Sequence, residues 1–164
     1  YYSLYHCRMT SNEKILTKFY SAFANGDVTK MCECYDSDVQ FQDPAFGILK
    51  GSDVCTMWKM LLEKSNGTIK IEFSSIKADE YRGHVKWIAT YPVSKTKRIV
   101  VNHVRSEKQK KNGLIYRQID YFDIWKWSKQ AFGFTGYIFG WTGYFQRKIE
   151  EKALASLKKY KNEN

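Results

Sequence analysis

The N-terminal part of the chain is dominated by apolar residues at helical spacing. Thr10 and Glu13 have the spacing of a capping box, and the apolar residues after them recur every three or four positions as far as Gly26. This pattern predicts a first helix that ends at Gly26. Asp27 then caps a short second helix, and a third helix is predicted over residues 51–66, where Asn-Gly stops it.

Between the second and third helices, apolar and polar residues alternate with period two. In such a strand Val39 and Phe41 face inward, and Asp43 falls on that same face before Pro44 ends the strand. A carboxylate is expensive to bury in a core, so its inward position predicts a cavity with a polar floor. The alternative for Asp43 is a turn-forming residue whose side chain accepts hydrogen bonds from nearby backbone N–H groups.

The second half of the chain switches to period two and predicts four strands. These cover 69–73, 85–91, 99–107 and 114–127, with hairpin-turn chemistry at 110–113. Helices that precede a run of antiparallel strands predict an α+β fold, in which three N-terminal helices pack on one face of a curved, mainly antiparallel sheet.

The last predicted strand also carries polar residues at inward-facing positions. Gln118, Asp120 and Phe122 share one face, whereas Asp123 takes the other face unless a bulge intervenes. Parity therefore favours Asp120 as a second carboxylate in the cavity. A salt bridge to a basic neighbour is the alternative for Asp120, and a hydrogen-bonded structural role at the end of the sheet is the alternative for Asp123.

The C-terminal region differs from the rest in composition. Glycines punctuate an aromatic run over 132–145, which is compatible with a helical or a looped path. A basic amphipathic helix over 146–164 follows, so the domain itself is predicted over 9–145. Residues 1–8 do not share its pattern and are interpreted as an extension or an expression-vector remnant.

Charge and cysteine content narrow the picture further. The net charge of +10 is concentrated in 77–111, which holds ten basic and three acidic residues, and in the C-terminal helix. Cys32-x-Cys34 is a poor zinc spacing, so neither a metal nor a cofactor is predicted, and the thiols are expected to be reduced. Without a secretory signal or a membrane-length apolar run, a cytoplasmic location is expected, with the nucleus as the alternative.

Several short motifs resemble the nuclear transport factor 2-like superfamily, in its SnoaL-like and ketosteroid isomerase-like branch. They are Phe19-Tyr20-x-Ala22-Phe23-x-x-Gly26-Asp27, Cys34-Tyr35-x-x-Asp38-Val39-x-Phe41-x-Asp43-Pro44 with Gly51, Asn112-Gly113-x-Ile115, and Asp123 with Gln130-Ala131-Phe132-Gly133. The resemblance implies a cone-shaped roll with a pocket between the helices and the sheet. Isomerases, cyclases, epoxide hydrolases and non-catalytic modules share that fold, so the fold does not decide the activity.

The resemblance also implies roles for individual residues. Asp43 falls on the position of the isomerase's general base, and Asp123 resembles the acid–base residue of SnoaL-like cyclases. The isomerase's oxyanion donors have no counterpart here: Phe19 stands at the tyrosine position, with Tyr20 one residue out of register, and no Asp stands near Arg105. The catalytic candidates are thus Asp43, Asp120 and Asp123.

The remaining candidate pocket residues are mainly aromatic. They are Phe19, Tyr20, Tyr35, Phe41, Trp58, Trp87, His103, Gln118 and Phe122. For His103, a role as an acid–base partner and one as an ordinary strand residue stay open.

Three classes of function compete. The favoured one is a protein that binds or converts a small hydrophobic ligand, without a cofactor. The second is a non-catalytic interaction or transport module that forms a homodimer through the sheet face, with Trp87, Trp125 and Trp127 supplying the surface. The third uses the basic regions; a membrane surface is less favoured as a partner, and nucleic acid is not expected because no recognition motif is present.

Overall fold

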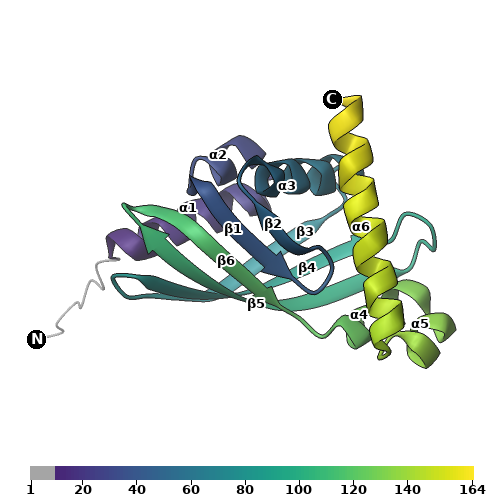
Figure 1. The fold of residues 1–164 in the computed structure, drawn as a ribbon. Helices are drawn as coiled ribbons and strands as arrows, with labels where there is room; N and C mark the ends of the chain where they lie inside the picture. The colour runs from purple at the N-terminus through teal and green to yellow at the C-terminus, as the bar shows by residue number, and fades with distance from the viewer. Residues whose placement is uncertain (1–9) are drawn as a thin grey trace, which may run out of the picture.

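The computed structural model describes residues 10–164, so the prediction for residues 1–8 lies outside the described part of the chain. Its elements are α1 (Ser11–Ala24), α2 (Val28–Cys32), β1 (Tyr35–Asp43), β2 (Gly47–Lys50), α3 (Ser52–Ser65), β3 (Lys70–Ala78), β4 (Arg82–Pro92), β5 (Ile99–Lys111), β6 (Leu114–Tyr121), α4 (Ile124–Phe132), α5 (Phe134–Phe139) and α6 (Gly143–Glu163). Figure 1 shows α1, α2 and α3 together on one side of the strands.

The three N-terminal helices begin and end where the sequence predicts. The capping box at α1 is confirmed, because Thr10 Oγ1 accepts from Glu13 N at 3.1 Å and Thr10 N donates to Glu13 Oε2 at 2.9 Å. Asp27 caps α2 by accepting from Lys30 N. The apolar face of α1 is fully buried against the sheet, which fixes one wall of the domain.

The strands form one six-stranded sheet in the order β2-β1-β6-β5-β4-β3. All neighbouring pairs are antiparallel except β1 with β6, which run parallel. Asn112 and Gly113 both have positive φ, as the tight turn between β5 and β6 requires. The α+β prediction is confirmed, with a mixed sheet that is mostly antiparallel.

The predicted strand over 114–127 is too long. β6 ends at Tyr121, and Asp123 instead caps α4 by accepting from Lys126 N at 2.9 Å. The tryptophans at 125 and 127 alternate as in a strand, but the side chain of Asp123 caps a helix that begins at Ile124. The short strand β2 was not predicted. It pairs with β1, and the turn that follows Asp43 connects the two strands.

The C-terminal helix α6 packs across the end of α3. Leu157 is buried, Lys161 Nζ lies 2.5 Å from Asp53 Oδ1, and Tyr160 donates a hydrogen bond to Glu63. In Figure 1, α6 runs from α4 and α5 at one end of the sheet up to α3. The amphipathic helix predicted over 146–164 is therefore docked on the domain. None of the helices in residues 10–164 is both long and apolar enough to cross a bilayer.

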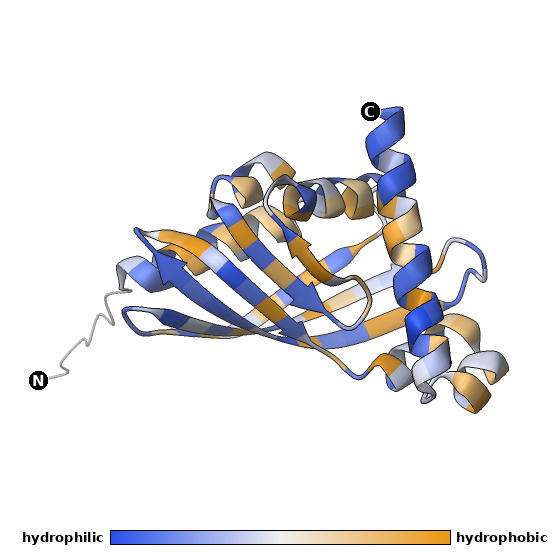
Figure 2. Cartoon of the chain, in the orientation of Figure 1, coloured by the Kyte–Doolittle hydropathy of each residue, from blue (hydrophilic) through white to orange (hydrophobic). Residues whose placement is uncertain are grey.

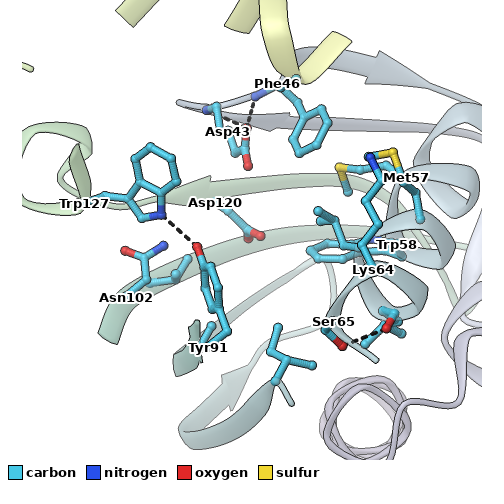
Figure 3. A pocket seen from close by; sticks show the side chains of 18 of the residues that line it. Asp43, Phe46, Met57, Trp58, Lys64, Ser65, Tyr91, Asn102, Asp120 and Trp127 are labelled. Carbon is cyan, nitrogen blue, oxygen red and sulfur yellow. Dashed lines mark hydrogen bonds between the residues drawn. The ribbon is translucent and has the colours of Figure 1, made fainter. Parts of the chain in front are cut away.

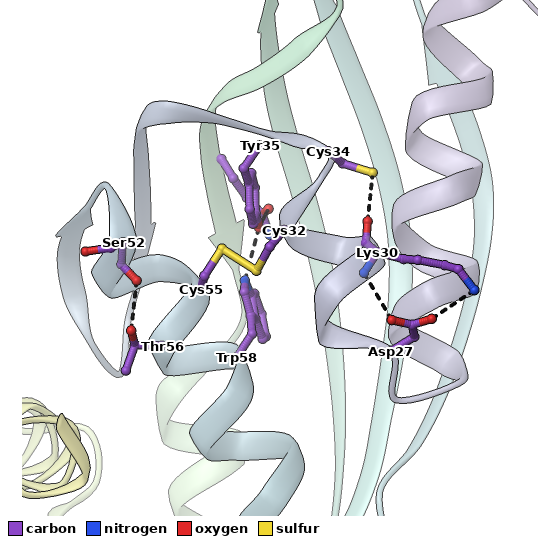
Figure 4. Close-up of a disulfide and its surroundings, with 10 residues drawn as sticks. Asp27, Lys30, Cys32, Cys34, Tyr35, Ser52, Cys55, Thr56 and Trp58 are labelled. Carbon is purple, nitrogen blue, oxygen red and sulfur yellow. Dashed lines mark hydrogen bonds and ion pairs between the residues drawn. A yellow bond between two sulfur atoms is a disulfide. The ribbon is translucent and has the colours of Figure 1, made fainter. Parts of the chain in front are cut away.

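The cysteines differ from the prediction. Cys32 at the end of α2 and Cys55 in α3 form a disulfide, with their Cα atoms 5.9 Å apart (Figure 4), so the expectation of reduced thiols is wrong for this pair. Only Cys34 is a free thiol among the described residues, and it is buried. The two helices bring together side chains 23 residues apart, which spacing alone does not reveal. The expected cytoplasmic location stays a prediction.

Candidate functional site

A cavity of about 380 Å³ lies between the sheet and α3, and α6 covers part of it. Figure 3 shows side chains from both halves of the chain around this space. Most of the lining is apolar. It consists of Phe23, Ala45, Phe46, Met57, Trp58, Met60, Leu61, Leu62, Ile69, Trp87, Ala89, Tyr91, Pro92, Val93, Val104, Phe122, Trp127 and Ala153, with Asp43, Lys64, Ser65, Ser94, Asn102, Asp120 and Ser156 as the polar members.

Asp43 ends β1 and combines the two predicted roles. Its Oδ1 accepts from the backbone N–H groups of Ala45 at 2.9 Å and Phe46 at 2.6 Å, while the side chain lines the cavity. Burial raises the pKa of Asp43 to about 7; the N–H groups of Phe46 and Ala45 lower it, and the charges of Asp120 and Glu150 raise it. The turn thus holds the carboxyl group in place without returning its pKa to the ordinary range.

Asp120 on β6 is the second carboxylate of the cavity and is almost fully buried. Gln118 Nε2 donates to both of its oxygens, at 3.0 and 2.9 Å, and Ser106 Oγ donates to Oδ1. Burial raises the pKa of Asp120, while the charge of Lys108 and these hydrogen bonds lower it. The alternation of inward and outward side chains along the strand therefore predicted the position of Asp120 correctly.

The hydrogen bonds behind Asp120 all run toward it. Tyr20 OH and Trp87 Nε1 donate to Ser106 Oγ at 2.7 and 3.0 Å, and the Ser106 hydroxyl donates a hydrogen bond to Asp120. On the other side, Trp58 Nε1 donates to the Tyr35 hydroxyl at 3.1 Å, and Tyr35 donates to Gln118 Oε1 at 2.5 Å. This polarity favours an acceptor, the carboxylate form, at the centre of the network.

Lys108 completes the network from β5. Its Nζ lies 4.0 Å from the centre of the Phe19 ring and donates a hydrogen bond to Gln118 Oε1. Burial lowers the pKa of Lys108 to about 7, whereas the charge of Asp120 raises it. Sequence reasoning missed this residue. Val104, Ser106 and Lys108 occupy successive inward-facing positions of one strand, and a lysine at such a position is as unusual as the two aspartates.

Two predicted site residues lie away from both the cavity and the hydrogen-bond network beneath it. Asp123 is exposed and caps α4. His103 is exposed on the outer face of β5, because its neighbours Asn102 and Val104 are the inward positions. The resemblance placed Asp123 at an acid–base position, but in this chain the end of β6 turns its side chain away from the cavity.

The other predicted residues divide into two groups. Trp58, Trp87 and Phe122 line the cavity, as Asp43 and Asp120 do. A second group lies in the core and the hydrogen-bond network beneath it. This group consists of Phe19, Tyr20, Tyr35, Phe41 and Gln118.

Sequence reasoning also missed cavity residues from the C-terminal half. Trp127 Nε1 donates to the Tyr91 hydroxyl of β4 at 2.7 Å, so α4 supplies part of the cavity wall. Lys64 donates to Ser156 and thereby joins α3 to α6 at the cavity wall. These contacts link elements distant in sequence, and no local pattern signals them.

The tryptophans expected at a dimer surface lie elsewhere. Trp87 is buried, Trp127 lines the cavity, and Trp125 is on α4 rather than on the outer face of the sheet. The homodimer stays a prediction, without these side chains as its basis. Within residues 10–164, no group of three or more His, Cys, Asp or Glu side chains is placed to hold a metal ion.

Comparison with known proteins places this geometry in a family. A model described as the SnoaL-like domain matches residues 16–118, well over half of the chain. The matched segment runs from α1 into β6, so α4, α5 and α6 lie beyond it. We found no curated protein whose sequence matches this chain.

Solved structures share the fold at low sequence identity. A nuclear transport factor 2-like protein of unknown function from Burkholderia pseudomallei is 15% identical, with a TM-score of 0.64 over 76% of this chain and 100% of that chain. An epoxide hydrolase of the LEH-like type from M. tuberculosis is 19% identical, with a TM-score of 0.59 over 78% and 92%. A protein proposed to be a polyketide cyclase, from Xanthomonas campestris, is 16% identical, with a TM-score of 0.60 over 74% and 96%.

Proposed function

The chain belongs to the SnoaL-like domain family, and we propose that it binds a small hydrophobic ligand in its cavity and carries out acid–base chemistry on it. One observation supports this proposal above the others. Two carboxyl groups, Asp43 and Asp120, project into a largely apolar cavity from two strands of the sheet. The turn at Asp43 and the hydrogen bonds to Asp120 hold both groups in place, and proton transfer at a bound ligand would use carboxyl groups that are costly to bury.

The cavity has the size and lining of a ligand site. Its volume of about 380 Å³ lies within the usual range for small-molecule pockets, which extends from roughly 300 to 1,000 Å³. Apolar and aromatic side chains supply most of its wall, and the polar groups are few. This composition favours an uncharged, mainly apolar molecule with one or two oxygen atoms that meet the carboxyl groups.

The chemistry follows from the protonation of Asp43. A carboxyl group with a pKa of about 7 is divided between its acid and base forms near neutral pH, so it can accept or donate a proton. As a base it would remove a proton next to a ligand carbonyl, and as an acid it would protonate an epoxide or carbonyl oxygen. Asp120, held by Ser106 and Gln118, is the second proton acceptor.

The names of the structural relatives guide the choice of test ligands. One is an epoxide hydrolase and another is proposed to be a polyketide cyclase, so hydrophobic ketones and epoxides are the first classes to examine. We propose to follow hydrogen–deuterium exchange next to the carbonyl of 2-tetralone and opening of styrene oxide, both by NMR. Each would be measured with the wild-type protein and with Asp43→Asn and Asp120→Asn.

The proposal predicts that Asp43→Asn lowers the exchange or ring-opening rate at least about 100-fold, since a positioned acid–base group contributes that much. Asp38→Asn is the matched control, because Asp38 is exposed on the same strand and should leave the rate unchanged. Rates that stay at the wild-type level in both Asp43→Asn and Asp120→Asn would remove the catalytic part of the proposal.

A second pair of variants tests the cavity itself. Ala153 on α6 lines the cavity, whereas Ala155 is exposed on the same helix. Ala153→Trp should abolish binding of the uncharged fluorescent probe N-phenyl-1-naphthylamine, and Ala155→Trp should leave it intact. Equal binding by both variants would show that the probe does not enter the cavity.

A further inference from the structure

The segment that joins α4 to α6 carries a cluster of exposed apolar side chains. Six large residues within eleven positions are between 39% and 77% exposed. We call this cluster the aromatic cap; its members are Phe134, Tyr137, Ile138, Phe139, Trp141 and Tyr144. Figure 2 shows the hydrophobic colours of α5 at one end of the molecule, next to the hydrophilic α6. Single exposed apolar residues are ordinary, but a contiguous cluster marks an interaction surface.

Glycine contacts direct these side chains outward. A Cβ atom on Gly136 would lie 1.9 Å from the Ser128 carbonyl oxygen, and one on Gly140 would lie 2.7 Å from Ser128 Cβ. Gly136 and Gly140 therefore face α4, which leaves the aromatic residues of this segment on the outer side. Trp125 Nε1 donates to the Tyr137 carbonyl at 3.1 Å and fixes the two helices together.

Basic residues outnumber acidic ones at the cap: Asp123, Glu150 and Glu151 flank residues 124–149, and Glu151 pairs with Lys148. Residues 124–149 and the β4–β5 loop at 93–98 together contain seven Lys or Arg and no Asp or Glu. The two segments are in contact, because Arg98 Nε donates to the Gln130 carbonyl at 2.7 Å and Thr96 Oγ1 to the Ala131 carbonyl at 2.9 Å. The cap therefore combines exposed aromatic groups with a positive local charge.

We propose that the aromatic cap docks this protein on the surface of an anionic lipid bilayer. Trp and Tyr favour the interface between lipid headgroups and hydrocarbon, and nearby Lys and Arg add attraction to anionic headgroups. The six-residue helix α5 can lie in that interface but is far too short to cross it. A second copy of the chain is a poorer fit, since two caps of the same positive charge repel each other.

Docking would also orient the cavity. Val93 and Ser94 of the β4–β5 loop and Trp127 of α4 line it, and both elements flank the aromatic cap. A membrane at the cap would therefore lie next to one end of the cavity, where a ligand dissolved in lipid could be taken up. The docking itself does not depend on the proposed chemistry, because it needs neither Asp43 nor Asp120.

Flotation with lipid vesicles tests the proposal directly. The full chain would be mixed with vesicles of phosphatidylcholine that contain about 30 mol % phosphatidylglycerol, and with vesicles of phosphatidylcholine alone. We expect binding to the anionic vesicles that is at least about tenfold stronger and that falls in about 0.5 M NaCl. Asp43→Asn should bind as the wild type does, which separates this test from that of the proposed function.

Paired variants separate the apolar and charged contributions. Phe134→Ser with Phe139→Ser, and separately Lys95→Gln with Lys97→Gln, should each weaken vesicle binding about tenfold or more. Ile48→Ser and Lys111→Gln are the matched controls, because both residues are exposed outside the cap, and these variants should bind normally. All these substitutions are at exposed positions, so circular dichroism should show an unchanged fold.

Three outcomes would overturn the proposal. The first is the absence of binding to anionic vesicles, or binding that Phe134→Ser with Phe139→Ser leaves unchanged. The second is binding to single-stranded RNA or DNA that competes fully with the vesicles, which would identify the cap as a nucleic-acid surface. The third is a dimer in light scattering that dissociates in the same phenylalanine variant, which would identify the cap as a self-association surface.

Discussion

Gln118 connects Lys108 to Asp120 through its side-chain amide. Its Oε1 accepts from Lys108 Nζ, and its Nε2 donates to both carboxylate oxygens of Asp120. An amide in this orientation is stabilised by a cation on one side and an anion on the other. Every buried polar side-chain atom in the described residues has a hydrogen-bond partner, so the network is complete beneath the cavity.

Lys108→Met should raise the pKa of Asp120. The charge of Lys108 lowers that pKa, and methionine fills similar space without a charge, so we expect the pKa of Asp120 to increase in the variant. Carboxyl carbon NMR measures it as a shift in the titration midpoint of Asp120. Lys86→Met, at an exposed position on β4, should leave that midpoint in place. An unchanged midpoint in Lys108→Met would show that the two groups are not coupled.

Asp43→Asn should make stability less dependent on pH. The pKa of Asp43 is raised from 3.8 to about 7 in the folded state, so the folded protein holds this proton between pH 4 and 7 while the unfolded chain has lost it. Wild-type stability therefore falls across that window as the pH rises.

The variant lacks this loss and should be about 1–3 kcal/mol more stable at pH 8, with no difference below pH 4. Urea unfolding at a series of pH values measures it. Asp38→Asn is the control on the same strand and should follow the wild type. A variant that is less stable than the wild type at pH 8 would contradict the raised pKa.

Reduction of the Cys32–Cys55 disulfide should destabilise the fold. The bond closes a loop of 23 residues between α2 and α3, for which loss of chain entropy in the unfolded state gives about 3 kcal/mol. A thiol reductant should therefore lower the melting temperature of the wild type. In Cys32→Ala with Cys55→Ala, the melting temperature should already be low and should not respond to the reductant. A response of equal size in that double variant would assign the effect to other thiols.

Gly136→Ala should weaken the packing of α5 on α4, and Gly143→Ala should not. The added Cβ at Gly136 meets backbone atoms of Ser128, which cannot move aside, whereas nothing lies within 4 Å of a Cβ at Gly143. We expect a loss of about 2 kcal/mol or more for the first variant and no loss or a small gain for the second. Thermal unfolding compares them. Equal stability would mean that the two helices are not held in this close contact.

The sequence predicted most of what local patterns determine. The capping box at Thr10 and the period-two alternation around Asp43 located the first helix and the first strand, because caps and side-chain parity depend on neighbours in the chain. Parity also placed Asp120 correctly. The inward position of Lys108 follows from the same rule applied to β5, so that signal was present in the sequence.

Features that depend on contacts between distant elements were not predictable in this way. The pairing of Cys32 with Cys55 requires the angle between α2 and α3, and the wall that Ser156 supplies requires α6 to dock on α3. The end of β6 was missed for a different reason. Trp125 and Trp127 are two residues apart, as side chains on one face of a strand are. The cap at Asp123 begins a helix, however, and in a helix residues two apart do not share a face.

The central claim is that Asp43 is an acid–base group inside a cavity that admits an apolar ligand. The most direct test is a pH titration of its carboxyl carbon by NMR, with and without N-phenyl-1-naphthylamine. We predict a midpoint at about 7 in the free protein, and a further rise when the probe fills the cavity and excludes water. A midpoint near the ordinary value of 3.8 that the probe does not move would contradict the claim.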